Sequence, residues 1–70
     1  MKANDAISKI LSDRDKSKRS LADDLGISPQ ALDIRLKARS MKVETLVDTV
    51  TPLGYRVELV SDNDKIELDG

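Results

Sequence analysis

This 70-residue chain offers few kinds of side chain that could do chemistry. It has no cysteine and no histidine, which effectively excludes disulfides, zinc sites and histidine acid–base catalysis. No glycine-rich phosphate loop is present, and the adjacent carboxylates Asp23 and Asp24 are typical of a solvated helix face. We therefore expect a binding protein that is not an enzyme and that uses no metal and no cofactor.

Residues 30–37 combine hydrogen-bonding and apolar side chains at helical spacing. If Leu32 and Leu36 face a core, the side chains on the opposite side of the same helix point outward. An amide there can pair with adenine, a carboxylate with cytosine N4, an ammonium with guanine, and an aliphatic group can contact the thymine methyl. An ordinary solvated helix face is the alternative interpretation, and for Asp33 a further alternative is a contact with Arg35, Lys37 or another basic residue. The predicted base-contacting residues are Gln30, Ala31, Asp33, Ile34 and Lys37.

Basic and hydroxyl side chains lie on both sides of that segment. One group stands at residues 17–19 and 28, where two helices are expected to begin and backbone N–H groups favour anions. The other follows the second helix. A solvated basic rim is the alternative, but these are also the places where phosphate contacts would position a protein on DNA. The predicted phosphate-contacting residues are Ser17, Lys18, Arg19, Ser28, Arg39, Ser40 and Lys42.

Charge is divided unevenly along the chain. Residues 1–42 carry ten Lys or Arg and six Asp or Glu, a net charge of +4, whereas residues 43–70 carry two and seven, a net charge of −5. A basic front half would face phosphates while the acidic half faced away from them. Chance segregation in a short chain is the other interpretation.

Two short helices joined by a tight turn must position these side chains. Ser17 and Ser28 have the place and type of N-caps, and Pro29 stands at the first helical position, where its missing N–H has no cost. Gly26 falls where the first helix needs a left-handed residue to end. We expect helices over 18–25 and 29–38, in the layout of a helix-turn-helix whose second helix enters the DNA major groove.

Two further helices are expected outside this motif. Asn4 is the predicted N-cap of a helix over about 4–12. A second helix over about 43–51 has an apolar stripe at spacings of three and four, and Pro52 should end or kink it. The stripe consists of Val43, Leu46, Val47 and Val50.

The hydrophobic period then changes from 3.6 to 2, which predicts strands over about 55–60 and 65–68. The fold class is mainly α with a small C-terminal β-hairpin, in a single domain over residues 1–70. An isolated hairpin is marginal in water, so it must cover its own helices or pair with a second copy. The predicted dimer-interface residues are Tyr55, Val57, Leu59, Val60, Ile66 and Leu68.

Several segments together resemble the lambda-repressor/Cro-like (XRE-type) helix-turn-helix family over residues 4–60. They are Leu21-Ala22, Leu25-Gly26-Ile27-Ser28, Gln30-Ala31-Leu32, Arg35-Leu36-Lys37, Val43 to Leu46 and Leu53-Gly54-Tyr55. The resemblance implies a small phage- or bacterial-type transcription regulator that binds a palindromic operator as a dimer. It places Lys18 where the family often touches phosphate, and Pro29, Gln30, Asp33 and Ile34 in the base-reading part of the second helix. Pro29 departs from the polar residue usual there, and Pro52 stands where the family usually continues its helix.

The resulting expectation is a Cro-like repressor that binds sequence-specific double-stranded DNA as a homodimer and acts by occlusion. It is expected to be cytoplasmic, without a membrane segment and without a small-molecule ligand. The alternative is a protein-interaction module on the same scaffold, such as an antitoxin, an antirepressor or a complex subunit.

Overall fold

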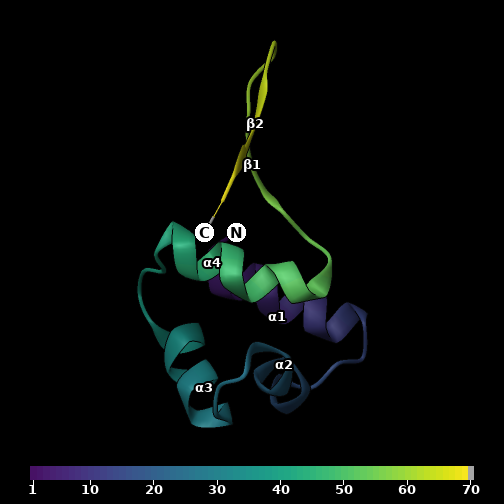
Figure 1. The fold of residues 1–70 in the computed structure, drawn as a ribbon, viewed down its shortest axis with the longest axis vertical. Helices are drawn as coiled ribbons and strands as arrows, with labels where there is room; N and C mark the ends of the chain where they lie inside the picture. Colours follow the sequence, from purple (N-terminus) through teal and green to yellow (C-terminus); the bar gives the residue numbers. More distant parts are fainter. Residues whose placement is uncertain (70) are drawn as a thin grey trace.

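Four helices pack around one small core, and a two-stranded hairpin projects from them (Figure 1). The structure is a computed structural model and describes residues 1–69. It confirms the expected fold class, mainly helical with a C-terminal hairpin. The elements are α1 (Ala3–Asp13), α2 (Lys18–Leu25), α3 (Pro29–Lys37), α4 (Val43–Val50), the 3-10 helix η1 (Thr51–Leu53), β1 (Val57–Val60) and β2 (Lys65–Leu68).

Five element boundaries differ from prediction by one or two residues. The first helix extends one residue beyond the expected 4–12 at each end, α3 and α4 end one residue before the expected 38 and 51, and β1 begins at Val57 and not at residue 55. The helix expected over 43–51 stops at Val50 and tightens into η1, because Pro52 has no N–H to continue the α-helical ladder. The first helix begins at Ala3 with Lys2 as its N-cap residue, so the prediction that Asn4 caps it was wrong. Instead, Asn4 lies inside α1, and its Nδ2 donates to the backbone oxygen of Leu36 at 2.9 Å.

Three helical segments end in the same way, with one residue in the left-handed region. That residue is Asp15 (φ 52°) after α1, Gly26 (φ 70°) after α2 and Gly54 (φ 82°) after η1. The next N–H in each case donates to the carbonyl five residues back, the bond that defines a Schellman motif. The bonds are Lys16 to Leu11 at 2.9 Å, Ile27 to Ala22 at 3.1 Å and Tyr55 to Val50 at 3.2 Å.

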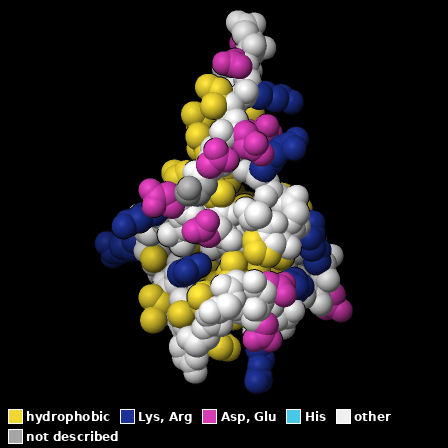
Figure 2. Space-filling view, in the orientation of Figure 1, with side chains coloured by type: hydrophobic (Ala, Val, Ile, Leu, Met, Phe, Trp, Pro, Cys, Tyr) yellow, Lys and Arg dark blue, Asp and Glu magenta, His cyan; other side chains and the backbone are white. Residues whose placement is uncertain are grey.

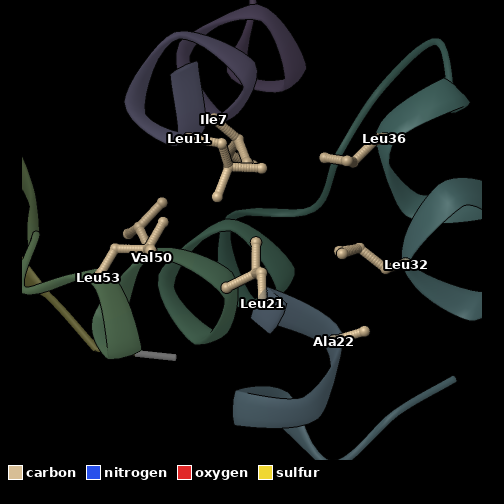
Figure 3. Packing of buried hydrophobic residues seen from close by; sticks show 8 residues of the cluster. All are labelled: Ile7, Leu11, Leu21, Ala22, Leu32, Leu36, Val50 and Leu53. Carbon is tan, nitrogen blue, oxygen red and sulfur yellow. The ribbon is translucent and has the colours of Figure 1, made fainter. Parts of the chain in front are cut away.

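The core is built from aliphatic side chains of all four helices and η1 (Figure 3). The apolar stripe predicted for α4 is only partly correct, because Val43 is 51% exposed whereas Val50 is buried. Val43 is the first residue of α4 and lies beyond the edge of the core. Thr49 is fully buried, and its hydroxyl donates to the Thr45 carbonyl at 2.7 Å. The buried hydrophobic residues are Ile7, Leu11, Leu21, Ala22, Leu32, Leu36, Val50 and Leu53.

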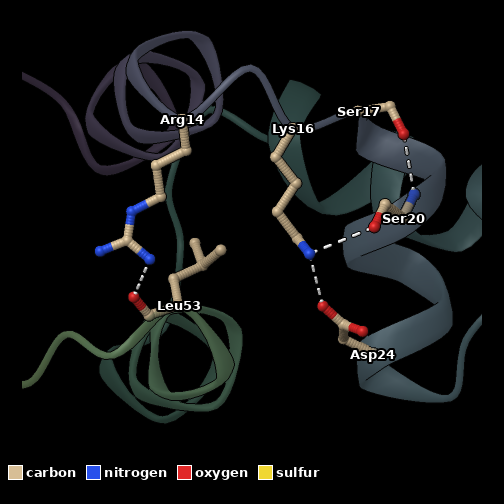
Figure 4. Close-up of polar contacts among 6 residues, drawn as sticks. All are labelled: Arg14, Lys16, Ser17, Ser20, Asp24 and Leu53. Atoms are coloured by element: carbon tan, nitrogen blue, oxygen red, sulfur yellow. Dashed lines mark hydrogen bonds and ion pairs between the residues drawn. The ribbon is translucent and has the colours of Figure 1, made fainter.

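Long polar side chains hold the segments together at the α1–α2 connection (Figure 4). Arg14 donates to the Leu53 carbonyl, and its guanidinium carbon lies 5.1 Å from the centroid of the Tyr55 ring, within cation–π range. Lys16 donates to Ser20 Oγ at 3.1 Å and pairs with Asp24 at 2.8 Å. Arg14 therefore fixes the base of the hairpin to α1.

The hairpin itself has one apolar face that its own helices leave open. The register pairs Val57 with Leu68 and Leu59 with Ile66, so these four side chains share a face. Val57 and Leu68 are half-buried near the helices, whereas Leu59 and Ile66 are 56% and 51% exposed. Figure 2 shows hydrophobic side chains along one side of the hairpin and acidic ones near its base.

Candidate nucleic-acid interface

Serine caps set the start of both helices of the helix-turn-helix. Ser17 Oγ accepts from the Ser20 N–H at 3.0 Å, and Ser28 Oγ accepts from the Ala31 N–H at 3.1 Å. Each cap satisfies one of the N–H groups that a helix start leaves without a partner. Both hydroxyls, predicted as phosphate contacts, therefore serve first as acceptors inside the protein and keep only their own O–H to donate outward.

The structure exposes the side of α3 that the spacing of Leu32 and Leu36 predicted to face outward. Leu32 is fully buried and Leu36 is 6% exposed, whereas Ile34 is 72% exposed. Gln30 is exposed one turn earlier on the same face, and Ala31 is half-buried at its flank. The exposed aliphatic side chain of Ile34 therefore lies on the same face as the exposed amide of Gln30.

Asp33 and Lys37, both predicted to meet bases, are in contact with each other. Lys37 Nζ lies 2.8 Å from Asp33 Oδ2, and Lys18 Nζ lies 4.0 Å from Asp33 Oδ1. The hydrogen bond from Lys37 lowers the pKa of Asp33 below its ordinary value, and the same bond raises the pKa of Lys37. Asp33 and Lys37 are therefore both charged at neutral pH, and Asp33 connects α3 to the start of α2.

Other cations around α3 are free of such pairing. Among residues 1–69, no carboxylate lies within ion-pair distance of Arg19, Arg39 or Lys42, and all three are exposed. Ser40 is exposed between the last two. These side chains are positioned at the start of α2 and in the connection from α3 to α4.

A shallow pocket of about 280 Å³ lies where α3 meets that connection. It brings Arg35, which is not among the predicted contacts, together with Ile34 and Lys42. The sequence signal for Arg35 is its place directly after Ile34, at the edge of the outward face. The remaining lining residues are Ala38, Ser40, Met41 and Thr45.

The predicted dimer residues lie apart from this surface, on the hairpin (Figure 1). Four of them share the apolar face, whereas Val60, 66% exposed, points to the opposite face because it alternates with Leu59. Tyr55 lies before β1, in contact with Arg14. The site residues therefore form two separate surfaces.

Within residues 1–69, no group of acidic side chains is arranged to hold a metal ion. No helix in the same range has the length and apolar character needed to cross a membrane. A comparison of the chain with family models, with curated proteins and with solved structures gives no match.

Proposed function

We propose that this chain is a sequence-specific transcription regulator that inserts α3 into the major groove of double-stranded DNA. The observation that carries the proposal is the outward face of α3. Ile34 is 72% exposed beside exposed Gln30, on a helix whose opposite face is buried. A helix-turn-helix presents its second helix in this way, with the N-terminal residues toward base edges.

Each side chain on this surface has a chemical partner in the groove. The Gln30 amide can pair with adenine N6 and N7, and Ile34 and Ala31 offer aliphatic contact to a thymine methyl. Pro29 at the first helical position has no N–H and contributes shape only. The unpaired cations Arg19, Arg39 and Lys42 supply phosphate contacts, which provide most of the affinity and depend on salt.

A second copy completes the proposal, because the hairpin has an open apolar face. Leu59 and Ile66 form a directly opposed pair that no helix of the same chain covers. Packing this face on that of a partner would remove both side chains from water. A homodimer presents two α3 helices to the two halves of a palindromic operator, and the bound dimer then blocks access of polymerase to the DNA.

Selection of bound duplexes from a random pool, followed by titration at 50 and 200 mM salt, tests DNA recognition. We expect salt-sensitive binding and a preferred sequence. Ile34→Ala should weaken binding to the selected duplex and leave binding to a scrambled duplex unchanged, because Ile34 contacts bases and not phosphates. Arg19→Gln should weaken both duplexes alike, and Lys65→Gln, on the hairpin, is the matched control. Absence of salt-sensitive binding would refute the proposal.

The dimer has its own test, a mass measured by analytical ultracentrifugation over a range of concentrations. Leu59→Ser should shift the mass toward that of a monomer. Val60→Ser is the matched control, since Val60 is as apolar and as exposed on the same strand but faces the other way. A monomeric wild type at high concentration, or equal effects of the two variants, would contradict the proposed interface.

The hairpin also favours a second candidate function, a protein-interaction module. Residues 43–70 carry a net charge of −5, and Glu58 and Glu67 form a cross-strand pair on the face of the hairpin opposite the open apolar one. Such a surface fits a basic protein partner. Leu59→Ser separates the two candidates, because a partner-binding module would lose its partner while any weak DNA binding stayed the same.

A further inference from the structure

Asp33 places a negative charge in the middle of the surface proposed to meet DNA. It lies on α3 between Gln30 and Lys37, and its side chain is 40% exposed. A carboxylate at that place repels phosphate and lowers the affinity of a basic surface for any duplex. Its presence on a DNA-binding helix therefore calls for a physical role.

The two oxygens of Asp33 face two cations on two different helices. Oδ2 lies 2.8 Å from Lys37 Nζ, one turn further along α3, and Oδ1 lies 4.0 Å from Lys18 Nζ in the first turn of α2. Both lysines belong to the surface expected to hold DNA. Asp33 thus occupies the position, relative to these lysines, that a phosphate oxygen would take in a complex.

Two simpler explanations account for less of this geometry. A helix-stabilising pair four residues apart explains the contact with Lys37 but not the approach to Lys18 across the turn. Direct acceptance from cytosine N4 would require Asp33 to exchange the hydrogen bond from Lys37 for one from a base. Arg19, Arg39 and Lys42 have no carboxylate partner within residues 1–69, so the pairing is confined to these two lysines.

We propose that Asp33 is an internal competitor of DNA phosphate for Lys18 and Lys37. It lowers the affinity for duplexes of every sequence, so that stable binding depends on the base contacts of Gln30 and Ile34. Asp33 is then a specificity-determining residue that makes no base contact of its own. This inference rests on the proposed DNA-binding function.

Asp33→Asn removes the charge at constant size and frees both lysines. Every additional phosphate that a freed lysine neutralises makes the slope of log affinity against log salt steeper by about 0.9. For each such phosphate, raising the salt from 50 to 200 mM should reduce the affinity of the variant by a further factor of about 3.5 compared with wild type. We expect the variant to neutralise about one or two more phosphates, because two lysines are freed. It should also bind a scrambled duplex more tightly and show a smaller ratio between selected and scrambled affinities.

Asp48→Asn is the matched control, because it makes the same change of net charge at an exposed position of α4 without an ion pair in the described chain. It should leave the salt slope unchanged. A double-mutant cycle with Lys37→Gln measures the pairing itself, since Asp33→Asn should increase affinity less when Lys37 is absent. Circular dichroism confirms that every variant is folded.

The outcomes separate the inference from the function on which it rests. If wild type binds DNA with a preferred sequence but Asp33→Asn behaves like Asp48→Asn, the proposed function stands and the role of Asp33 is refuted. An equal increase in affinity from Asp33→Asn with and without Lys37 would also overturn the pairing. If no variant binds any duplex, the DNA-binding function fails, and the inference fails with it.

Discussion

The hydrogen bond from Asn4 to Leu36 gives the sharpest prediction about stability, because it joins α1 to the end of α3. The backbone oxygen of Leu36 lies in the last turn of α3, where carbonyls have no partner within the helix. Asn4 Nδ2 supplies the missing donor at 2.9 Å. Its Oδ1 meanwhile accepts from the Asp5 N–H at 3.0 Å.

Asn4→Ala should destabilise the protein by about 1–2 kcal/mol, since the variant loses one hydrogen bond and leaves a partly buried carbonyl unpaired. For a domain of this size, that corresponds to a Tm lower by roughly 5–15 °C. Asn4→Asp keeps the acceptor toward Asp5 but replaces the donor with a charge near the negative end of α3. That repulsion should cost about 0.3–1 kcal/mol, and the same charge in the first turn of α1 should recover a similar amount, so Asn4→Asp should be about as destabilised as Asn4→Ala at pH 7.

Asn4→Asp should differ from Asn4→Ala at low pH. Below the ordinary pKa of an Asp, about 4, the introduced carboxyl is protonated and its O–H can donate to the Leu36 carbonyl in place of the lost amide, so Asn4→Asp should then be the more stable variant. Urea unfolding at about pH 7 and about pH 3.5, on either side of that pKa, measures both variants, with Asn63→Ala in the exposed hairpin turn as control. The reasoning is refuted if Asn4→Ala matches wild type, or if Asn4→Asp is no more stable than Asn4→Ala at about pH 3.5.

Three further predictions concern the turn, the ion pair and the core. Gly26→Ala should destabilise the protein by about 1 kcal/mol and Asp15→Gly should stabilise it by about 0.5 kcal/mol, because both positions have positive φ and only glycine adopts it without strain. Thermal unfolding measures both variants, and changes of stability in the same direction would contradict this reasoning. Lys37→Gln should raise the pKa of Asp33, measured by NMR, because the lysine bond that lowers it is lost; the stability from this bond is present above the ordinary pKa of an Asp and lost as pH falls through the lowered one. Leu32→Ala, at a fully buried position, should cost about 2–5 kcal/mol, and loss of the helical circular dichroism signal at room temperature checks it.

Local sequence chemistry determined most of the helix-turn-helix. Ser17, Ser28 and Pro29 define helix starts through bonds within four residues, and Gly26 defines a helix end through its own backbone freedom. The spacing of Leu32 and Leu36 determined which side of α3 is buried, and therefore that Ile34 is exposed. These signals are local, so no tertiary information was needed to interpret them.

The misassigned residues are those whose partners are distant along the chain. Asn4 has the residue type of an N-cap, yet its donor reaches Leu36, thirty-two positions away. Val43 has the spacing of a core residue, but it is the first residue of α4 and lies beyond the edge of the core, so it is exposed. Arg14, which lies outside every helix expected from the sequence, contacts Tyr55 and fixes the base of the hairpin.

The tertiary structure also decided how charge is used on the proposed interface. The sequence allowed a pair between Asp33 and Lys37, four positions apart on one helix, but not the approach of Lys18, because residues 18 and 33 have no periodic relation. The helical turn brings Asp33 within 2.8 Å of Lys37, and packing of α2 against α3 brings it within 4.0 Å of Lys18. Sequence therefore determined which residues face outward and which can pair within one helix, through local periodicity, and only the fold decided that Lys18 faces Asp33, since that depends on how two helices are packed.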